Sequence, residues 1–414
     1  MGFKSAFLGI ASFLLVLFSI VSGEARGEEF KLTPSIGIKE VFNDNVFLTE
    51  KNKEEDLITT IFPGIEISNR TERLNINLNA RWDIITYASN EELNFLNHNY
   101  KAMVTYSLYP ALRLSAEGSV TRDFSIDRDI EVTGLVTKAL KRYKYNFSGG
   151  AQYALTEKTR AEFSYSHERV DYSHDPEYLD TKSNGFNLGL THDLSEYILN
   201  TVGRINFGYF RYEFQENKVD YYYGTLGIGL SLTEKWSLLV DGGASYTISE
   251  FEAERLKFVP YFPFLITVRE REKEEGTGWV AQATISYRGE RTARGERTRG
   301  DLTFNHRVMP ASGTVGVTER TSVSLSLFSR FTYELSGRLS ASYYINKAER
   351  GKYSQSSINE TTFIVSPQLR YEFTDDIALE ASHSFYFGRD REAHADVSRN
   401  LFIMSLVFKH RLLE

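Results

Sequence analysis

The chain has 414 residues, a formal net charge of −7 and no cysteine, and 14% of its residues are aromatic. The lack of cysteine excludes disulfides, thiolate metal sites, cysteine nucleophiles and a lipid anchor on an amino-terminal cysteine. Charges of both signs are spread along the chain without basic clusters, so nucleic acid is not an expected partner.

Residues 1–25 are predicted to be a secretory signal peptide. Lys4 precedes an apolar run from Ala6 to Val21, and the small residues Gly23 and Ala25 precede the expected cleavage site. A retained membrane helix is the weaker alternative, because the run is shorter than the roughly 20 residues that a spanning helix needs. We therefore expect residues 26–414 to be exported and to form one domain.

From residue 73 onward, apolar and polar residues alternate along the chain. Leu74, Ile76 and Leu78 share one face of an extended segment, and the intervening asparagines share the other. The pattern recurs to Phe387, with no sustained period of 3.6 residues. It predicts an all-β chain whose strands run to about 10 to 16 residues, longer than the 5 or 6 usual in globular proteins.

The predicted connections alternate between short and long. The tight ones are 69–72, 109–112, 156–159, 233–236, 335–338 and 374–377, and the longer polar ones include 42–56, 88–99, 127–141 and 174–184. Transmembrane barrels have short periplasmic turns and longer outer loops. The sequence thus predicts an antiparallel up-and-down transmembrane β-barrel of about 18 strands (roughly 16 to 18), with both termini periplasmic.

The distribution of aromatic residues favours a barrel in lipid over a soluble β-sandwich or solenoid. Tyr143 with Tyr153, and Trp236 with Tyr246, stand near opposite ends of their strands. Aromatic girdles at the two lipid interfaces are typical of membrane barrels. Closing the sheet also leaves no unpaired backbone edge in hydrocarbon.

Two segments carry a resemblance to a known family. The first is "LTPSIGIKEVFNDNVFLTEKNKEEDLITTIFPGIEI", with Pro34, Asn43-Asp44-Asn45, Asp56 and Pro63, and the second is "VMPASGTVGVTERTSVSLSL" at 308–327. They resemble outer-membrane β-barrel porins whose genes are frequently found in exopolysaccharide loci of Gram-negative bacteria, including those linked to PEP-CTERM sorting. The resemblance implies a barrel of this size, a link to polysaccharide export, and no catalytic residues.

The carboxyl terminus departs from many such barrels, which end on an aromatic residue recognised by the assembly machinery. This chain ends "LVFKHRLLE". Either Phe402, Leu406 and Phe408 supply the recognition signal, or the end is atypical.

If the apolar face meets lipid, the alternate residues line a lumen wide enough for water. The charged residues expected there, nearly balanced in sign, are Arg73, Arg81, Asp83, Lys101, Arg113, Glu117, Lys144, Arg160, Glu162, Arg330 and Glu380. We expect no strong ion selectivity, and bridges between Arg81 and Asp83 and between Arg160 and Glu162. The plainer interpretation is that these charges only solvate a wet interior.

The connection 252–276 has an apolar middle with four aromatic residues, Phe258, Tyr261, Phe262 and Phe264. Folded into the lumen, it would form a constriction loop. The alternative is a structural segment, either against the rim or as an extracellular hairpin.

No enzyme, cofactor or metal site is expected. His383 and Ser384 lie on opposite faces of one strand, which is wrong for a nucleophile and its base. The predicted function is an outer-membrane channel serving exopolysaccharide export or secretion. The alternative is a non-conducting barrel that scaffolds the cell-surface polysaccharide machinery. Expected partners are outer-membrane lipid, the assembly machinery, polysaccharide and periplasmic export proteins.

Overall fold

The computed structural model describes residues 29–124, 141–172, 180–214, 217–258, 265–292, 295–310, 316–349, 354 and 357–412, with the backbone alone within 253–270. The predicted signal peptide, residues 1–25, lies outside the described residues. In the described part of the chain, no helix is apolar and long enough to span a membrane.

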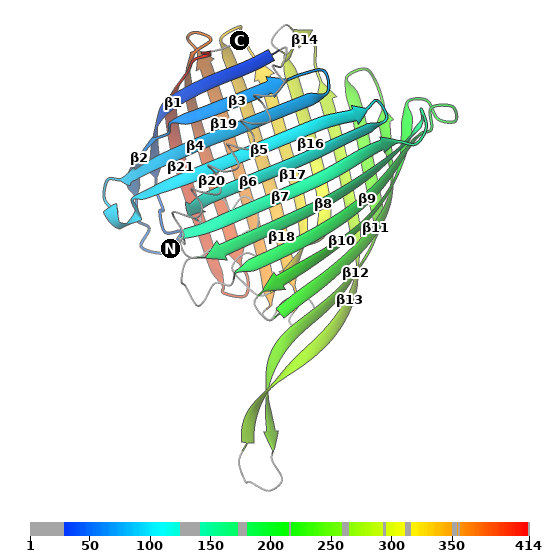
Figure 1. Cartoon of the computed structure of the whole chain (residues 1–414). Helices are drawn as coiled ribbons and strands as arrows, with labels where there is room; N and C mark the ends of the chain where they lie inside the picture. The colour runs from blue at the N-terminus through cyan, green and yellow to red at the C-terminus, as the bar shows by residue number, and fades with distance from the viewer. Residues whose placement is uncertain are drawn as a thin grey trace, which may run out of the picture.

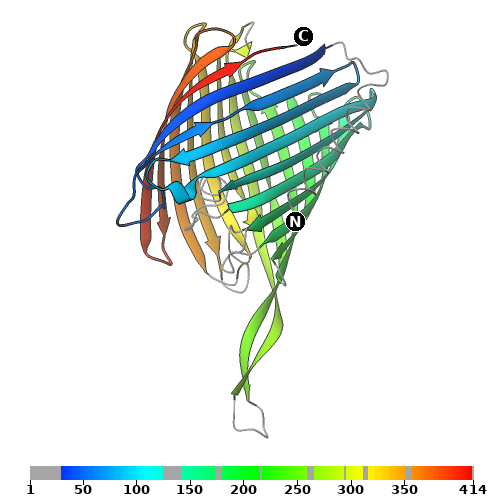
Figure 2. The same cartoon turned by 60° about the vertical axis from the view of Figure 1, so that its left-hand side comes forward.

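Nearly all described residues belong to long antiparallel strands (Figures 1 and 2). The strands are β1 (Glu29–Asn43), β2 (Asp56–Ile61), β3 (Gly64–Arg70), β4 (Leu74–Tyr87), β5 (Phe95–Tyr109), β6 (Leu112–Phe124), β7 (Lys141–Ala154), β8 (Thr159–Tyr172), β9 (Thr181–Asp193), β10 (Thr201–Phe214), β11 (Asn217–Ser231), β12 (Trp236–Phe258), β13 (Leu265–Arg288), β14 (Arg291–Thr292), β15 (Gly295–Glu296), β16 (Thr298–Pro310), β17 (Val317–Arg330), β18 (Leu335–Ala348), β19 (Ile358–Glu372), β20 (Ile377–Asp390) and β21 (Ala395–Lys409). A single 3-10 turn, η1 (Glu91–Leu93), precedes β5.

Each wall strand pairs with its neighbours in the chain, and β1 pairs with β21 to close the sheet into a barrel. β2 and β3 are two halves of one wall strand, since both pair with β1 and with β4 on either side of Phe62-Pro63. Counting these halves once turns the nineteen-stranded sheet into eighteen wall strands in the described chain. The predicted fold class and strand number are confirmed.

The seam between first and last strand is reinforced by the Asn43-Asp44-Asn45 segment. The Asp44 carboxylate accepts hydrogen bonds from the backbone N and side-chain Nδ2 of Asn400, both at 2.7 Å. Asn45 is fully buried, and its Nδ2 donates to the carbonyl oxygen of Ser398 at 3.0 Å. Barrel closure is thus the physical role of this polar segment.

Tight turns join the strands at one end of the barrel, which we call the short-turn end. Five of them begin with a threonine whose Oγ1 accepts backbone N–H bonds from two or three residues ahead, a local bond that favours turns. These threonines are Thr71, Thr156, Thr233, Thr332 and Thr374.

One predicted turn was wrong. Residues 335–338 lie within β18, where Arg330 pairs with Ser336 and Phe328 with Arg338. The turn is 331–334, capped by Thr332. The glycine at position 337 of the ladder leaves room for Phe331, since a Cβ there would lie 2.7 Å from Cε2 of that ring.

The two faces of the wall differ in polarity. Large apolar side chains stand exposed on the outer face, such as Phe207 (57% exposed) and Leu226 (68%), whereas their polar neighbours on the inner face, such as Thr225, are buried. Outer aromatic residues form two belts. Trp236 and Tyr287, with ring centroids 4.9 Å apart, lie near the short-turn end, and Tyr209 and Tyr222, also 4.9 Å apart, lie near the opposite, long-loop end.

Candidate functional site

Paired charges cover the inner face of the barrel wall. Most link one strand to another: Lys101–Glu117 (2.8 Å), Arg142–Asp123 (2.8 Å), Lys144–Glu168 (2.8 Å), Arg204–Asp241 (3.2 Å), Arg288–Asp301 (2.9 Å) and Arg370–Glu380. Because the cations of these pairs each lie beside a carboxylate, this part of the inner surface is polar but carries no extended field of one sign.

The ladder register shows where the predicted lumen residues lie. All but one occupy inward-facing positions of the wall: Arg81, Asp83, Lys101, Arg113, Glu117, Lys144, Arg160, Glu162, Arg330 and Glu380. Arg73 differs, because it lies in the tight turn between β3 and β4 rather than on a strand.

The two predicted bridges have different outcomes. Arg81 Nε donates to Asp83 Oδ1 at 2.6 Å along β4, and its guanidinium carbon also lies 4.2 Å from the centroid of the Phe62 ring. Glu162 instead accepts a hydrogen bond from Gln152 Nε2 at 3.0 Å, and no described contact joins it to Arg160.

Aromatic rings lie flat on the inner wall where a glycine leaves room for them. A Cβ added to Gly208 would lie 2.1 Å from Cε1 of Tyr223, and one added to Gly185 would lie 2.4 Å from Cε1 of Phe210. Tyr223 is held there by a 2.8 Å hydrogen bond from its hydroxyl to Asn187 Oδ1. Rings placed over strand glycines shield the backbone and keep the centre of the lumen free.

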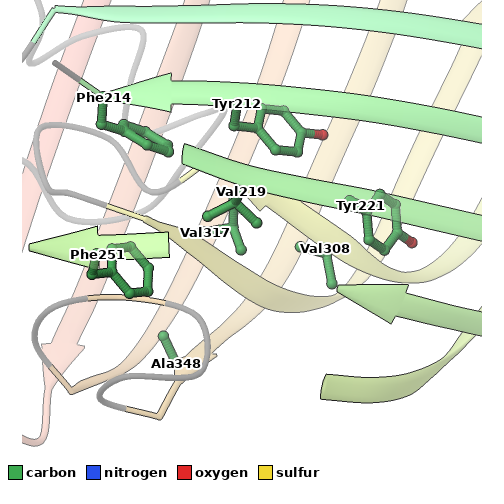
Figure 3. Close-up of a cluster of buried hydrophobic side chains, with 8 residues drawn as sticks. All are labelled: Tyr212, Phe214, Val219, Tyr221, Phe251, Val308, Val317 and Ala348. Carbon is green, nitrogen blue, oxygen red and sulfur yellow. The ribbon is translucent and has the colours of Figure 1, made fainter. Parts of the chain in front are cut away.

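A buried apolar cluster crosses the lumen side of the wall near the long-loop end (Figure 3). We call it the inner cluster; its members are Tyr212, Phe214, Val219, Tyr221, Phe251, Val308, Val317 and Ala348. Phe214, Val219 and Val317 have no exposed surface. β10–β12 therefore contact the ends of β16–β18 although β13 lies between them in the wall.

The register explains how the inner cluster forms. Val308 and Val317 occupy ladder positions on the outward side of β16 and β17, yet both pack against the inner wall of β10–β12. The joined ends of β16 and β17 must therefore bend into the lumen, so that their outward side meets that wall. We call residues 307–310 and 317–320 the inward-folded end. It narrows the lumen.

The predicted constriction loop lies at the end of a long hairpin. β12 and β13 pair continuously from Trp236↔Tyr287 to Phe258↔Leu265, and this hairpin projects well beyond the rest of the barrel (Figures 1 and 2). The backbone on either side of 259–264 thus forms a hairpin, which was the alternative expectation. The ends of β16 and β17 narrow the lumen. Tyr261, Phe262 and Phe264 lie outside the described residues, as does the side chain of Phe258.

A cavity of about 680 Å³ lies in the lumen beside the inner cluster. Charged residues line part of it, among them Glu117, Lys144, Glu168 and Asp241. Rings of the inner cluster and Tyr223 also line it. The cavity thus offers both ring faces and paired charges.

The inner cluster was missed by sequence reasoning, although a signal exists. In "YFRYEF" (209–214) and "YYY" (221–223), residues of both parities are aromatic. A strand with lipid on one face and water on the other alternates strictly, so loss of alternation marks a second buried face. Metal binding has no candidate, since no described group of three His, Asp or Glu side chains could hold an ion.

No protein-family model matches the sequence, and neither does any curated protein. Among solved structures, the chain is similar to OccAB4 from Acinetobacter baumannii, with 10% identity, a TM-score of 0.46, and coverage of 94% of this chain and 100% of that one. It is also similar to the outer membrane protein OpdK from Pseudomonas aeruginosa (9%, TM-score 0.42, coverage 92% and 99%). A third similar structure is the ferric-catecholate import receptor Fiu from E. coli K12 (8%, TM-score 0.47, coverage 94% and 82%). The fold assignment rests on the strand pairing, not on these similarities.

Proposed function

We propose that the protein is an outer-membrane channel, with its short-turn end in the periplasm and its long-loop end outside the cell. The observation that carries the proposal is the reversed polarity of the wall. Phe207 and Leu226 are exposed outside, while Thr225 and Asp241 are buried inside. Only lipid outside and water inside satisfy both faces of such a wall.

The charge pattern favours neutral or weakly charged solutes. The inner cations Lys101, Lys144, Arg204 and Arg370 each lie within 4.0 Å of a carboxylate. A solute ion therefore meets no strong field of the opposite sign, while hydroxyl groups find both donors and acceptors.

The finer proposal follows from the family resemblance of the sequence. We infer that the solute is a sugar or an extended polysaccharide strand moving outward, handed over by periplasmic export proteins. Tyr221 and Tyr223 line the cavity with ring faces, which suit the apolar faces of sugars. No catalytic step is part of this proposal.

Swelling of liposomes tests the channel proposal. The folded full-length chain is reconstituted, and swelling is followed in neutral sugars from a pentose to a hexasaccharide. We expect swelling that falls as the sugar grows, and none with chain denatured before reconstitution. Absence of swelling with every sugar would favour the non-conducting scaffold.

A second measurement addresses the polysaccharide. Neutral and acidic oligosaccharides of equal length are added to single channels in a planar bilayer. Transient blocks of the current by either series support a sugar polymer as cargo. Conductance without blocks would leave a general channel and reject this cargo.

A further inference from the structure

The hydrogen-bond ladder of the wall is interrupted between β13 and β16 near the long-loop end. The two strands pair from Arg288↔Arg299 to Ala281↔His306, and pairing stops there. Beyond this point, residues 273–280 of β13 pair with β12 alone, and residues 307–310 of β16 pair with β17 alone. The hairpin continues outward while the inward-folded end turns into the lumen, so these two edges are not paired with each other. We call this unpaired stretch of the wall the side gap.

The side gap begins at the level of the outer aromatic belt. The rings of Trp279 and His306 stack on the outer face, with centroids 3.6 Å apart and planes within 4°. The belt residue Tyr222 pairs with Tyr246, and Tyr246 pairs with Thr277 on β13. Trp279 lies two residues from Thr277, on its short-turn side. In the proposed orientation this level is the interface between lipid and outer solvent.

The inner side of the gap opens into the lumen cavity. Val280 and Ala281 on β13 and Met309 and Pro310 on β16 line the same cavity of about 680 Å³. Rings of the inner cluster and Tyr223 line it too, and Val280 packs against that cluster. A molecule entering between the two strands would thus meet apolar surface first.

One guanidinium group stands at this entrance. Arg307 lines the cavity and pairs in the ladder with Arg320 on β17. Arg320 is buried beside β18, where its Nε donates to Asn346 Oδ1 at 2.8 Å and its guanidinium carbon lies 5.1 Å from the centroid of the Tyr344 ring. Arg307 contacts no carboxylate in the described part of the chain. Like charges placed opposite each other in a ladder destabilise it, and an anion bound to Arg307 reduces that cost.

We propose that the side gap is a lateral entrance for a single-chain amphipathic anion, such as a fatty acid, moving between the outer membrane surface and the lumen. Its head group binds Arg307, and its chain lies against the tyrosine rings of the cavity. This goes beyond the channel proposal, because the route crosses the wall and does not need solutes to pass along the barrel axis.

The gap itself is tested with cysteine pairs, since the natural chain has no thiol. If the ladder continued, Gly278 would face Met309. The matched control is Thr284 and Thr303, paired on the same two strands with their Oγ1 atoms 3.3 Å apart. In lipid vesicles we expect oxidation to link the control pair (T284C/T303C) and to leave the gap pair (G278C/M309C) reduced. Equal disulfide yields would overturn the proposal.

The ligand is tested with a single reporter thiol in the gap, Met309→Cys, labelled by a water-soluble maleimide. Dodecanoate should slow labelling by about tenfold, whereas butyrate and dodecanol should not, because the site needs both the charge and the chain. Adding Arg307→Gln should abolish this protection. Arg299→Gln, on the same face of β16 but at the short-turn end, should leave it intact.

A second reporter, Thr277→Cys on the opposite edge, covers the case in which Met309→Cys does not fold. Labelling that dodecanoate leaves unchanged at either thiol, or that butyrate slows equally, would contradict the proposal. Liposome swelling is measured on the same preparations, so loss of the axial channel and loss of the lateral site are distinguished.

Discussion

The two long-loop segments that flank the side gap behave in opposite ways. The β12–β13 hairpin leaves the barrel and projects outward, whereas the ends of β16 and β17 bend inward and pack on the wall. Both segments contain apolar residues. The inward-folded end meets a complementary surface, provided by Tyr212, Phe214 and Val219 on the inner wall. The hairpin sequence instead places acidic and basic residues at close intervals, which protects free strand edges from pairing with other chains.

The difference teaches that an apolar connection does not by itself predict a constriction. Inward folding needs an apolar patch on the inner wall at the same height, because an inward strand must bury its side chains against something other than water. Removing one side of that contact should therefore release the inward-folded end, which would then no longer differ from the hairpin.

The largest effect is expected for Val317→Asp. Val317 has no exposed surface within the inner cluster, so the carboxylate would be buried among apolar side chains. We expect a loss of at least about 3 kcal/mol in unfolding free energy and release of the inward-folded end. Urea unfolding from vesicles measures the loss, and a higher single-channel conductance reports the release.

The control for this change is Ser324→Asp, on the inward side of the same strand, with an expected loss below about 0.5 kcal/mol. A folded Val317→Asp variant with unchanged conductance would show that the inward-folded end does not narrow the lumen.

A smaller effect is expected for Gly208→Val, which changes the inner wall and not the inward-folded end. The new side chain would displace the Tyr223 ring and break its bond to Asn187. We expect a loss of about 1 to 3 kcal/mol and a lower conductance, because the ring moves toward the lumen axis. Gly229→Val, on the inner face of β11 with open space around it, should change neither quantity. Equal effects of the two variants would argue against flat rings on the wall.

The smallest effect is expected when residues 253–270 are replaced by an Asn-Gly turn joining Glu252 to Arg271, which face each other in the ladder. A two-stranded hairpin is marginally stable alone, so unfolding free energy should change by less than about 1 kcal/mol. Conductance should be unchanged. A conductance increase would restore the constriction role first expected for this segment.

Much of the fold could be predicted because every wall strand obeys the same local rule. Lipid on one face and water on the other force alternation, so strand number and inward-facing charges follow from parity. The turn at 331–334 shows the limit of that rule. Gly337 interrupts the pattern because Phe331 packs over it, and the reliable local signal was Thr332, which matches the turns at Thr156 and Thr233.

The inner cluster and the side gap could not be predicted in the same way. They depend on contacts between strands separated in the wall, such as Tyr221 on β11 with Val308 on β16. The alternation along β16 places Val308 on the outer face. The bend of the strand turns that face toward the inner wall. The resemblance at 308–327 marked the segment without indicating its direction.

The central claim is that water fills the inside of this wall and lipid covers its outside. The most direct test places single cysteines at Tyr145, Asn146, Phe147 and Ser148, four consecutive residues of β7, in protein folded into lipid vesicles. A water-soluble methanethiosulfonate reagent should modify the cysteines at 146 and 148 and spare those at 145 and 147, where the natural side chains are exposed on the outer face. Equal modification at all four positions, or the reverse alternation, would contradict the account.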